Sequence, residues 1–396
     1  MQFSYQIVWT NFLALIFFTL PYYHDINIER HMISNTKYPI MTDKQPKLSF
    51  PNHCSLEKLF LVARHGTRYP EEPDIKKFEV LENIFQNVSS KHKVFIPNYV
   101  RTGMSGISYS IGLLDGKGIL GKGDYQPVYI STIPVLQDYE LAIHRSCPRW
   151  KETVQNNNEK LEKQIFHFTS NLTKISNRVS KKYNIENPPL EPIHINYIYL
   201  ACAYDIIFFD KNRHWCEILQ QEEILTLEYF NDMRYYYEFS YGSDLNKQLA
   251  CKLVGEIVKG VDDYLNGDST VKADLRFTHS ETMMFLYTFL GFYEDSNPLT
   301  GNATFDEISN RKFKTSEICP FAANVYFEIY TCASDKYTFF YKKKHEESIV
   351  VQVVVNEKPV VVPGCGSKFC EWNKFKELFS DNLDCDFEKI CNLDKN

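Results

Sequence analysis

The sequence lacks an excess of positive charge. Its 44 lysines and arginines stand against 50 aspartates and glutamates, which gives a formal net charge of -6. Binding to a phosphate backbone relies on a broad basic surface, so this balance argues against nucleic acid as a partner. It does not argue against a small anionic substrate, because a few arginines and lysines can make one pocket positive within an acidic protein.

Internal repeats and low-complexity tracts are also missing from the 396 residues. A composition of 44% hydrophobic, 24% charged and 15% aromatic residues is typical of a soluble globular protein and excludes collagen-like and broadly disordered chains. Because single cores stop growing at roughly 250 to 300 residues, the length allows one or two domains.

The motifs of a structural zinc site are absent too, since the chain has no paired C-x-x-C or H-x-x-x-H arrangement. We therefore expect no metal and no cofactor. The 11 cysteines instead predict disulfides in an oxidising compartment, and their odd number leaves at least one unpaired or linked between chains. The spacing of Cys365 and Cys370 suits a local loop closure, and Cys385 and Cys391 could tie the C-terminal tail to the body. The remaining connectivity stays open.

The first 21 residues are predicted to be a signal peptide, because the apolar run from Ile7 to Leu20 is too short for a comfortable membrane span. An uncleaved anchor is the alternative, since no lysine or arginine precedes the run and no small-residue cleavage site stands out. Asn-x-Ser/Thr sequons at Asn87, Asn171 and Asn302 agree with export. The chain ends in L-D-K-N, which is not a retention signal, so we expect a secreted glycoprotein without a stable membrane span. The lumen of the endoplasmic reticulum is the alternative location.

The rest of the chain divides into four segments. Residues 22–52 are polar and irregular and are expected to be a leader, residues 53–124 and 266–396 two parts of an α/β domain, and residues 125–265 a helical cap domain. Within the cap, residues 150–175 and 220–239 show helical spacing of apolar side chains. The predicted fold class is α/β, with a doubly wound, mostly parallel sheet and an inserted helical cap.

Polar side chains follow the ends of two predicted strands of the α/β domain. The continuously apolar run Leu59 to Ala63 predicts a buried strand, and residues 64–70, R-H-G-T-R-Y-P, follow it. Residues 274–278 predict a second strand, followed by H-S-E at residues 279–281 and an apolar helix over residues 282–292. Ligands bind beyond the carboxyl ends of strands in open α/β sheets, so we expect the site here.

Two further strands are expected near the C-terminus. Residues 348–355 predict a Val-rich strand, and residues 357–359 predict the turn before another strand at residues 360–363.

The segment at residues 64–70 places a histidine between two arginines, with Gly66 leaving room for a ligand at the backbone. Two guanidinium groups can bind the oxygens of a transferring phosphoryl group while a neutral imidazole attacks phosphorus. The product would be a phosphohistidine. The alternative is a surface loop whose charges are coincidental.

Several motifs occur in an order that resembles the histidine acid phosphatase superfamily, on the branch of the multiple inositol polyphosphate phosphatases. They are R-H-G-T-R-Y-P at residues 64–70, Q-P-V at 126–128, H-W-C at 214–216, R-F-T-H-S-E at 276–281 and P-F-A-A-N at 320–324. The resemblance implies the histidine phosphatase fold, with His65 as the nucleophile and Arg64 and Arg68 as phosphate-binding residues.

The same resemblance implies three more site residues. A third phosphate-binding arginine opens a helix in an R-T-x-x-S segment, which Arg101 matches, although a basic loop residue is the alternative. His279 would contact phosphate, and Glu281 would be the general acid unless it merely caps its helix. Acid phosphatases have His-Asp at this position, so H-S-E favours the inositol polyphosphate branch.

The chain departs from the family between two of these motifs. Only 36 residues separate His65 from Arg101, where about one helix and its loops would be expected, and Pro97 disfavours a central strand before that arginine. The resemblance therefore implies a secreted phosphatase for inositol polyphosphates, with 2,3-bisphosphoglycerate as a further candidate substrate. The alternatives are a catalytically impaired anion-binding protein of the same fold and a general acid phosphatase.

Overall fold

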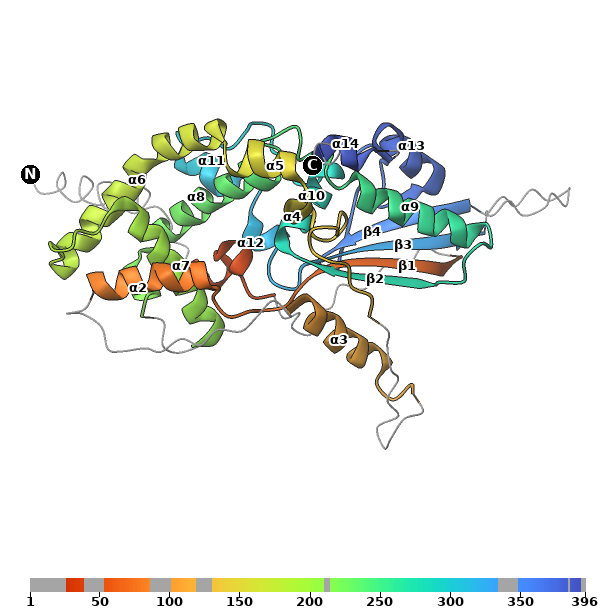
Figure 1. Cartoon of the computed structure of the whole chain (residues 1–396), viewed down its shortest axis with the longest axis horizontal. Coiled ribbons are helices and arrows are strands. Elements are labelled where there is room, and N and C mark those ends of the chain that lie inside the picture. Colours follow the sequence, from red (N-terminus) through yellow and green to blue (C-terminus); the bar gives the residue numbers. More distant parts are fainter. Residues whose placement is uncertain are drawn as a thin grey trace, which may run out of the picture.

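The computed structural model describes residues 26–38, 53–85, 101–118, 130–209, 214–333, 348–383 and 385–392. They form a lobe built on a β-sheet and a lobe made of helices, which lie side by side (Figure 1). None of the helices in these ranges combines the length and the apolar character needed to cross a membrane. The predicted signal peptide and Asn87 lie outside the described residues.

Six strands of the described residues form the sheet, in the order β2-β1-β3-β4-β5 with β6 also beside β4. Their bounds are β1 Cys54–Arg64, β2 Ala273–Thr278, β3 Asn324–Cys332, β4 Ser348–Val355, β5 Lys358–Val360 and β6 Phe369–Glu371. Among these strands β1 and β2 pair in parallel, whereas the pairings of β3 with β1 and of β4 with β3, β5 and β6 are antiparallel. The α/β class is confirmed, but the sheet is mixed rather than mostly parallel. A continuous apolar run indicates burial on both faces and carries no information on strand direction, which is why the sequence misled on this detail.

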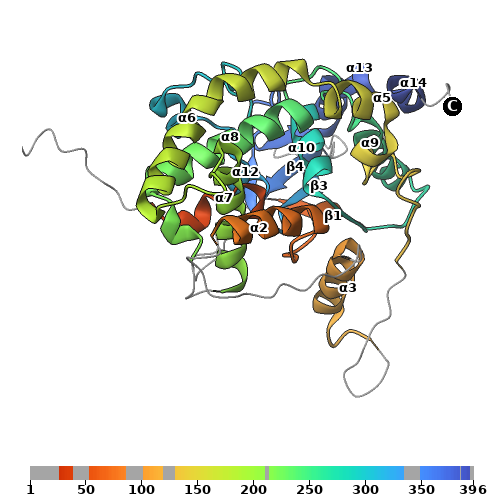
Figure 2. The same ribbon diagram turned by 60° about the vertical axis from the view of Figure 1, so that its left-hand side comes forward.

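Helices cover both faces of the sheet (Figure 1). Helices α9 (Cys251–Leu265) and α13 (Trp372–Leu383) lie on one face, where Phe60 of β1 packs beside Gly260 of α9. Helix α3 (Arg101–Leu114) lies on the other, where Gly106 approaches the ring of Phe277 on β2. The second view shows α3 standing apart from α6 (Glu159–Tyr183) and α8 (Gln221–Phe239) of the helical lobe (Figure 2).

The helical lobe centres on α6 (Glu159–Tyr183), α7 (Pro192–Phe208) and α8 (Gln221–Phe239), and α2 (Glu72–Ile84) packs against α7. The helix predicted over residues 220–239 is thus confirmed almost to the residue. The helix predicted over residues 150–175 is interrupted by a π-helical turn, Lys151–Gln155, before α6 begins. The helical lobe is not one continuous insert over residues 125–265. Helix α2 belongs to the lobe but precedes this range, and α9 lies within the range but packs on the sheet.

Shorter helical elements connect these parts. They are 3-10 turns at Ile28–Arg30, Ile33–Asn35 and Cys216–Ile218, and helices α4 Ile143–Ser146, α5 Pro148–Trp150, α10 Ser280–Phe289, α11 Phe305–Asn310, α12 Thr315–Ile318 and α14 Phe387–Cys391. The predicted succession of strand, H-S-E turn and helix is observed as β2 followed by α10. Strand β4 has its predicted bounds, but β5 starts earlier than expected because Asn356 and Glu357, both at positive φ, already complete the turn.

Residues 26–38 belong to the folded body, although the sequence places them in a leader and starts the fold near Cys54. Met32 is fully buried, the Tyr199 hydroxyl donates a hydrogen bond to the His31 carbonyl, and Phe321 N donates to Thr36 O over 3.0 Å. These contacts come from residues distant in the sequence, so the segment has no local periodicity that could reveal it. We call residues 26–38 the N-terminal strap.

Five disulfides join ten of the 11 cysteines. The bond between Cys365 and Cys370 confirms the predicted local closure. The expectation that the last two cysteines tie the tail to the body is also confirmed, and the full set of pairs is 54–332, 147–391, 202–216, 251–385 and 365–370. The remaining thiol, Cys319, is buried and unpaired.

Candidate active site at the ends of two parallel strands

The candidate site begins where β1 and β2 end side by side. Arg64 is paired with Thr278 in the parallel register, and His65 N donates a hydrogen bond to Thr278 O over 3.0 Å. His65 and His279 therefore leave the sheet together, and their ring centroids are 5.4 Å apart. The pairing of these strands thus brings together two residues that are 214 positions apart in the sequence.

His65 is held as a neutral imidazole in one tautomer. Its Nδ1 lies 2.7 Å from Gly66 O, and Arg101 Nε donates to its Nε2 over 3.0 Å, so the proton sits on Nδ1 and the lone pair on Nε2. Burial, together with the charge of Arg64, lowers the pKa of His65 to about 2. The atom that faces the guanidinium groups is thus an unprotonated nitrogen, as a nucleophile requires.

Arg64 is buried behind this ring. Its Nη1 donates to Cys319 O over 2.8 Å and to the carbonyl of Ser34 in the N-terminal strap, and its guanidinium carbon lies 4.5 Å from the centre of the Phe321 ring. Its Nε is buried and has no hydrogen-bond partner among the described residues. Arg64 is therefore fixed by the backbone, and its Nε–H is left for an acceptor such as a phosphate oxygen.

Arg68 and Arg101 approach each other through Glu71. Arg101, at the start of α3, places Nη1 2.8 Å from Glu71 Oε1 and Nη2 3.4 Å from His279 Nδ1. Arg68 Nε lies 3.7 Å from the same Glu71 oxygen, and its Nη1 donates to Tyr204 OH over 3.0 Å. The short segment before Arg101 therefore does not keep this arginine from reaching His65.

Glu281 follows His279 at the start of α10 and is buried. Burial would raise its pKa, but His144, His279 and a 2.9 Å hydrogen bond from Ser280 Oγ to its Oε2 outweigh burial and lower the pKa to about 2. The pKa of His279 is lowered to about 4, mainly by burial. Without a ligand, the carboxylate of Glu281 is therefore ionised beside a neutral imidazole.

The structure thus brings all six predicted site residues to one place, namely Arg64, His65, Arg68, Arg101, His279 and Glu281. Such a group of guanidinium and imidazole side chains around a buried, unprotonated imidazole nitrogen is suited to phosphoryl transfer. A family model described as histidine phosphatase superfamily (branch 2) matches residues 83–356. The chain belongs to this superfamily.

The relatives of this histidine phosphatase chain agree with that assignment. It is 29% identical over 340 residues to multiple inositol polyphosphate phosphatase 1 of Dictyostelium discoideum. This match covers 72% of this chain and 51% of that protein. It is 26% identical over 256 residues to the protein of the same name from Gallus gallus, covering 63% of this chain and 55% of that protein. The acid phosphatase PHO11 of Saccharomyces cerevisiae is 27% identical over 283 residues, covering 69% of this chain and 55% of that protein. The chain spans about half the length of the curated relatives it matches.

Solved structures confirm the expected histidine phosphatase fold. The phytase from D. castellii superposes with a TM-score of 0.68 at 18% identity, over 92% of this chain and 88% of that one. A Bifidobacterium longum multiple inositol polyphosphate phosphatase, in complex with phosphate, superposes with a TM-score of 0.60 at 13% identity, over 90% of this chain and 98% of that one.

Several residues of the candidate site were not predicted individually. Ser105 Oγ accepts a hydrogen bond from Gly66 N over 3.0 Å, and Phe321 packs on Arg64; both lie in motifs that carried the resemblance, so the signal was present. Glu71 and His144 lie outside those motifs. No local pattern distinguishes them, because only the tertiary fold brings them to the arginines and to His279.

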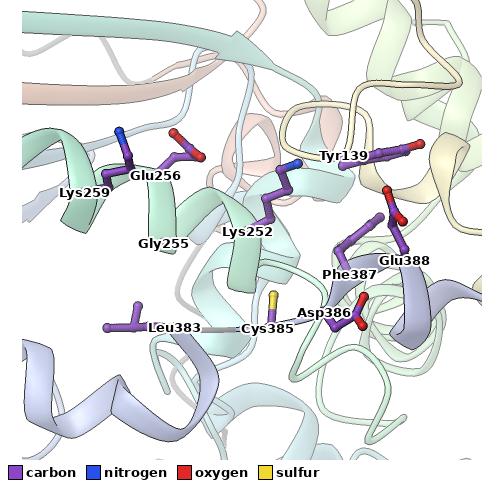
Figure 3. Close-up of a pocket in the computed structure, with 10 residues that line it drawn as sticks. All are labelled: Tyr139, Lys252, Gly255, Glu256, Lys259, Leu383, Cys385, Asp386, Phe387 and Glu388. Carbon is purple, nitrogen blue, oxygen red and sulfur yellow. The ribbon is translucent and has the colours of Figure 1, made fainter.

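A surface cavity of about 380 Å³ lies elsewhere, between α9 and the C-terminal residues (Figure 3). The Lys252 side chain points toward the Tyr139 ring there, 5.2 Å from its centre, opposite Asp386 and Glu388. None of the candidate site residues lines it. In the described part of the chain, no cluster of three His, Cys, Asp or Glu side chains is placed to hold a metal ion.

Proposed function

We propose that this chain hydrolyses phosphomonoesters of inositol polyphosphates through a phosphohistidine on His65, with Glu281 as general acid. The observation that carries the proposal is the 3.0 Å approach of Arg101 Nε to Nε2 of a buried, neutral His65. The names of the relatives, multiple inositol polyphosphate phosphatases and a phytase, support the substrate class.

Binding of the phosphate group uses donors that already converge. Arg64 Nε, Arg68 and Arg101 would donate to the non-bridging oxygens, and His279 would donate from its ring. Charge-assisted bonds from guanidinium groups are strong, and in a buried site they act with little reorganisation.

In the first step, Nε2 of His65 attacks phosphorus, a nitrogen–phosphorus bond forms and the ester oxygen leaves. Arg101 Nε turns from Nε2 to a phosphoryl oxygen at this point, while Gly66 O keeps its hydrogen bond with the Nδ1 proton and holds the ring in place. The leaving oxygen takes a proton from Glu281. A bound phosphate raises the pKa of that carboxyl by like-charge repulsion, so the substrate itself favours the protonated form.

In the second step, water attacks the phosphohistidine. Glu281, now a carboxylate, accepts a proton from this water, the nitrogen–phosphorus bond breaks and inorganic phosphate is released. His65 returns to its neutral form. The carboxylate is the stable state of Glu281 in the empty site, which suits this return to the start.

The test is phosphate release from inositol hexakisphosphate and from p-nitrophenyl phosphate, with and without EDTA, for the wild type and His65→Ala. We expect release that resists EDTA and is abolished by the substitution. A strict need for a divalent ion would contradict the phosphohistidine mechanism. 2,3-Bisphosphoglycerate is included as a further candidate substrate.

A second candidate function is an anion-binding protein of the same fold without turnover. The observation that favours it is the short segment between His65 and Arg101 in a chain that spans about half the length of its relatives. Binding of phosphate without release from any of these substrates would support it. Release from p-nitrophenyl phosphate alone would instead indicate a general acid phosphatase.

Secretion is part of the same proposal. Five disulfides fit an oxidising compartment, and Asn302 of one sequon is exposed. Expression in insect or mammalian cells should place the protein in the medium, with a mass that falls on treatment with a glycosidase for N-linked sugars. Retention inside the cell would favour the lumenal alternative.

A further inference from the structure

We propose that His144, on α4, is a further substrate-binding residue of this site, whose Nδ1–H donates to an anionic oxygen of the phosphorylated substrate. The proposal rests on the function proposed above and extends it by one residue. No residue of α4 belongs to a motif of the family resemblance.

The ring of His144 presents one buried donor that lacks an acceptor. Arg145 Nε donates to His144 Nε2 over 3.2 Å, which places the ring proton on Nδ1. His144 is only 9% exposed, and its Nδ1 has no hydrogen-bond partner among the described residues. Burial lowers the pKa of His144, so the ring stays neutral and keeps this single N–H. A buried donor without an acceptor destabilises a protein unless water or a ligand supplies one.

The ring that carries this donor lies beside the proposed catalytic residues. The ring of His144 packs edge-on against that of His279, with centroids 6.2 Å apart and an interplanar angle of 87°. The ring of His279 is in turn 5.4 Å from that of His65, so the three imidazoles are successive neighbours. His144 also has the largest effect among the groups that lower the pKa of Glu281, which places it close to the proposed general acid.

The position of α4 is fixed by the catalytic turn itself. The carbonyl of Leu141 accepts hydrogen bonds from Thr278 Oγ1 over 2.5 Å and from Thr282 Oγ1 over 3.0 Å. These two threonines flank residues 279–281, so the loop that leads into α4 is tied on both sides of the turn that carries His279 and Glu281. His144 therefore keeps its place relative to these residues, as a binding residue must.

The chemistry of the ligand follows from its surroundings. A neutral N–H near Arg101 and Arg145 selects an acceptor that carries negative charge, and the proximity of Glu281 places this acceptor near the leaving oxygen. A phosphate oxygen meets both conditions. It could belong to the reacting group or to a phosphate on a neighbouring carbon of the same substrate.

Calorimetric titration at pH 7 with inorganic phosphate and with myo-inositol hexakissulfate tests the proposal without requiring turnover. His144→Leu removes the donor, and we expect it to weaken binding of at least one probe by about 10-fold. His144→Asn places an amide N–H where Nδ1 lies and should recover most of the affinity. His144→Gln extends its amide toward the Nε2 side instead and should bind as weakly as the leucine variant.

The outcomes separate the possibilities. Weaker binding of both probes assigns the contact to the reacting phosphate, and weaker binding of the hexakissulfate alone assigns it to a neighbouring one. If the asparagine and glutamine variants, shown by their melting temperatures to be folded, bind both probes equally well, the proposal is overturned. A wild type that binds phosphate but releases none from any ester would contradict the proposed function and leave the result for His144 intact.

Discussion

The Glu71 carboxylate contacts the Arg101 guanidinium, with 2.8 Å between Oε1 and Nη1. The same oxygen lies 3.7 Å from Arg68 Nε, so one acidic group stands between two of the proposed phosphate-binding arginines. It aligns both guanidinium groups and neutralises part of their charge. A bound phosphate must then share these arginines with a carboxylate that repels it.

Replacing Glu71 by Gln should therefore tighten the binding of inorganic phosphate, because the repulsion is removed while an acceptor oxygen remains. We expect the inhibition constant for phosphate to fall by about fivefold, the order expected for one like charge near a partly exposed site. Product inhibition of p-nitrophenyl phosphate hydrolysis measures it. Glu72→Gln, at an exposed neighbour that pairs with Lys76, is the matched control. Weaker phosphate binding in E71Q would show that alignment of the arginines outweighs repulsion.

The pH dependence of turnover follows from two pKa values, that of the His65 imidazole and that of the Glu281 carboxyl. His65, the proposed nucleophile, has a pKa of about 2 and stays unprotonated at any ordinary pH, and Glu281, also with a pKa of about 2, is ionised when no substrate is bound. The proton for the leaving oxygen must therefore arrive with the substrate. We expect kcat/KM to fall as pH rises above about 6, where a phosphate monoester loses its second proton. A kcat/KM that rose with pH up to 8 would contradict this account.

Glu281→Gln should separate the two half-reactions. With p-nitrophenyl phosphate, whose leaving group needs little help from an acid, the first step should proceed and the second should stall for lack of a base, with turnover reduced by about 10²- to 10⁴-fold. Rapid mixing should show a burst of about one equivalent of p-nitrophenol, and acid-labile phosphate should stay on the protein. The same variant carrying His65→Ala should show no burst.

Stability should fall on mild acidification because two site histidines resist protonation in the folded state. Their pKa values drop from the ordinary 6.5 to about 2 for His65 and to about 4 for His279, so the unfolded chain binds more protons below pH 6.5. Each of these imidazoles should lower the free energy of unfolding by about 1.4 kcal/mol for each pH unit of acidification between pH 5.5 and 4.5. Urea unfolding at several pH values measures this, and His65→Asn should reduce the slope by about that amount. His53→Asn, at an exposed position, should leave it unchanged.

Two disulfides of very different span offer a matched stability comparison. Cys147 and Cys391 close a loop of 244 residues, and Cys365 and Cys370 close one of 5. A disulfide removes chain entropy from the unfolded state, and this loss of entropy grows with the span of the loop. Replacing both cysteines of one bond by alanine should therefore lower the free energy of unfolding by about 5 kcal/mol for the long loop and by about 2 kcal/mol for the short one. Equal losses in denaturant unfolding would mean that local packing, not loop closure, sets their contribution.

The sequence predicted which residues come together at the candidate site better than it predicted the sheet around them. Short motifs located Arg64, His65 and Glu281, because each motif directly follows a predicted strand and stays at that strand's end in any arrangement of the other strands. Strand direction could not be predicted, since an apolar or Val-rich segment such as β4 has the same composition in a parallel and in an antiparallel pairing. Arg101 was placed by its R-T-x-x-S context alone, and the fold shows that a short connection still reaches His65.

Contacts between distant residues account for what was missed. Glu71 and His144 gain their roles from partners on other elements, Arg101 and His279. The helical lobe was expected as one insert, but α9 carries apolar side chains that suit packing on a helix and on a sheet equally well. Helical periodicity identifies a buried face without identifying its partner.

The N-terminal strap also bears on how the protein is made. Its residues leave the ribosome early, yet the groups that hold it, the Tyr199 hydroxyl, the Glu228 carboxylate and the Phe321 amide, are synthesised much later. The carbonyl of Ser34 can hold Arg64 only after translation has passed those positions. A nascent chain arrested before residue 321 would thus display His65 without its neighbouring guanidinium in place, and phosphatase competence should emerge only close to the end of synthesis.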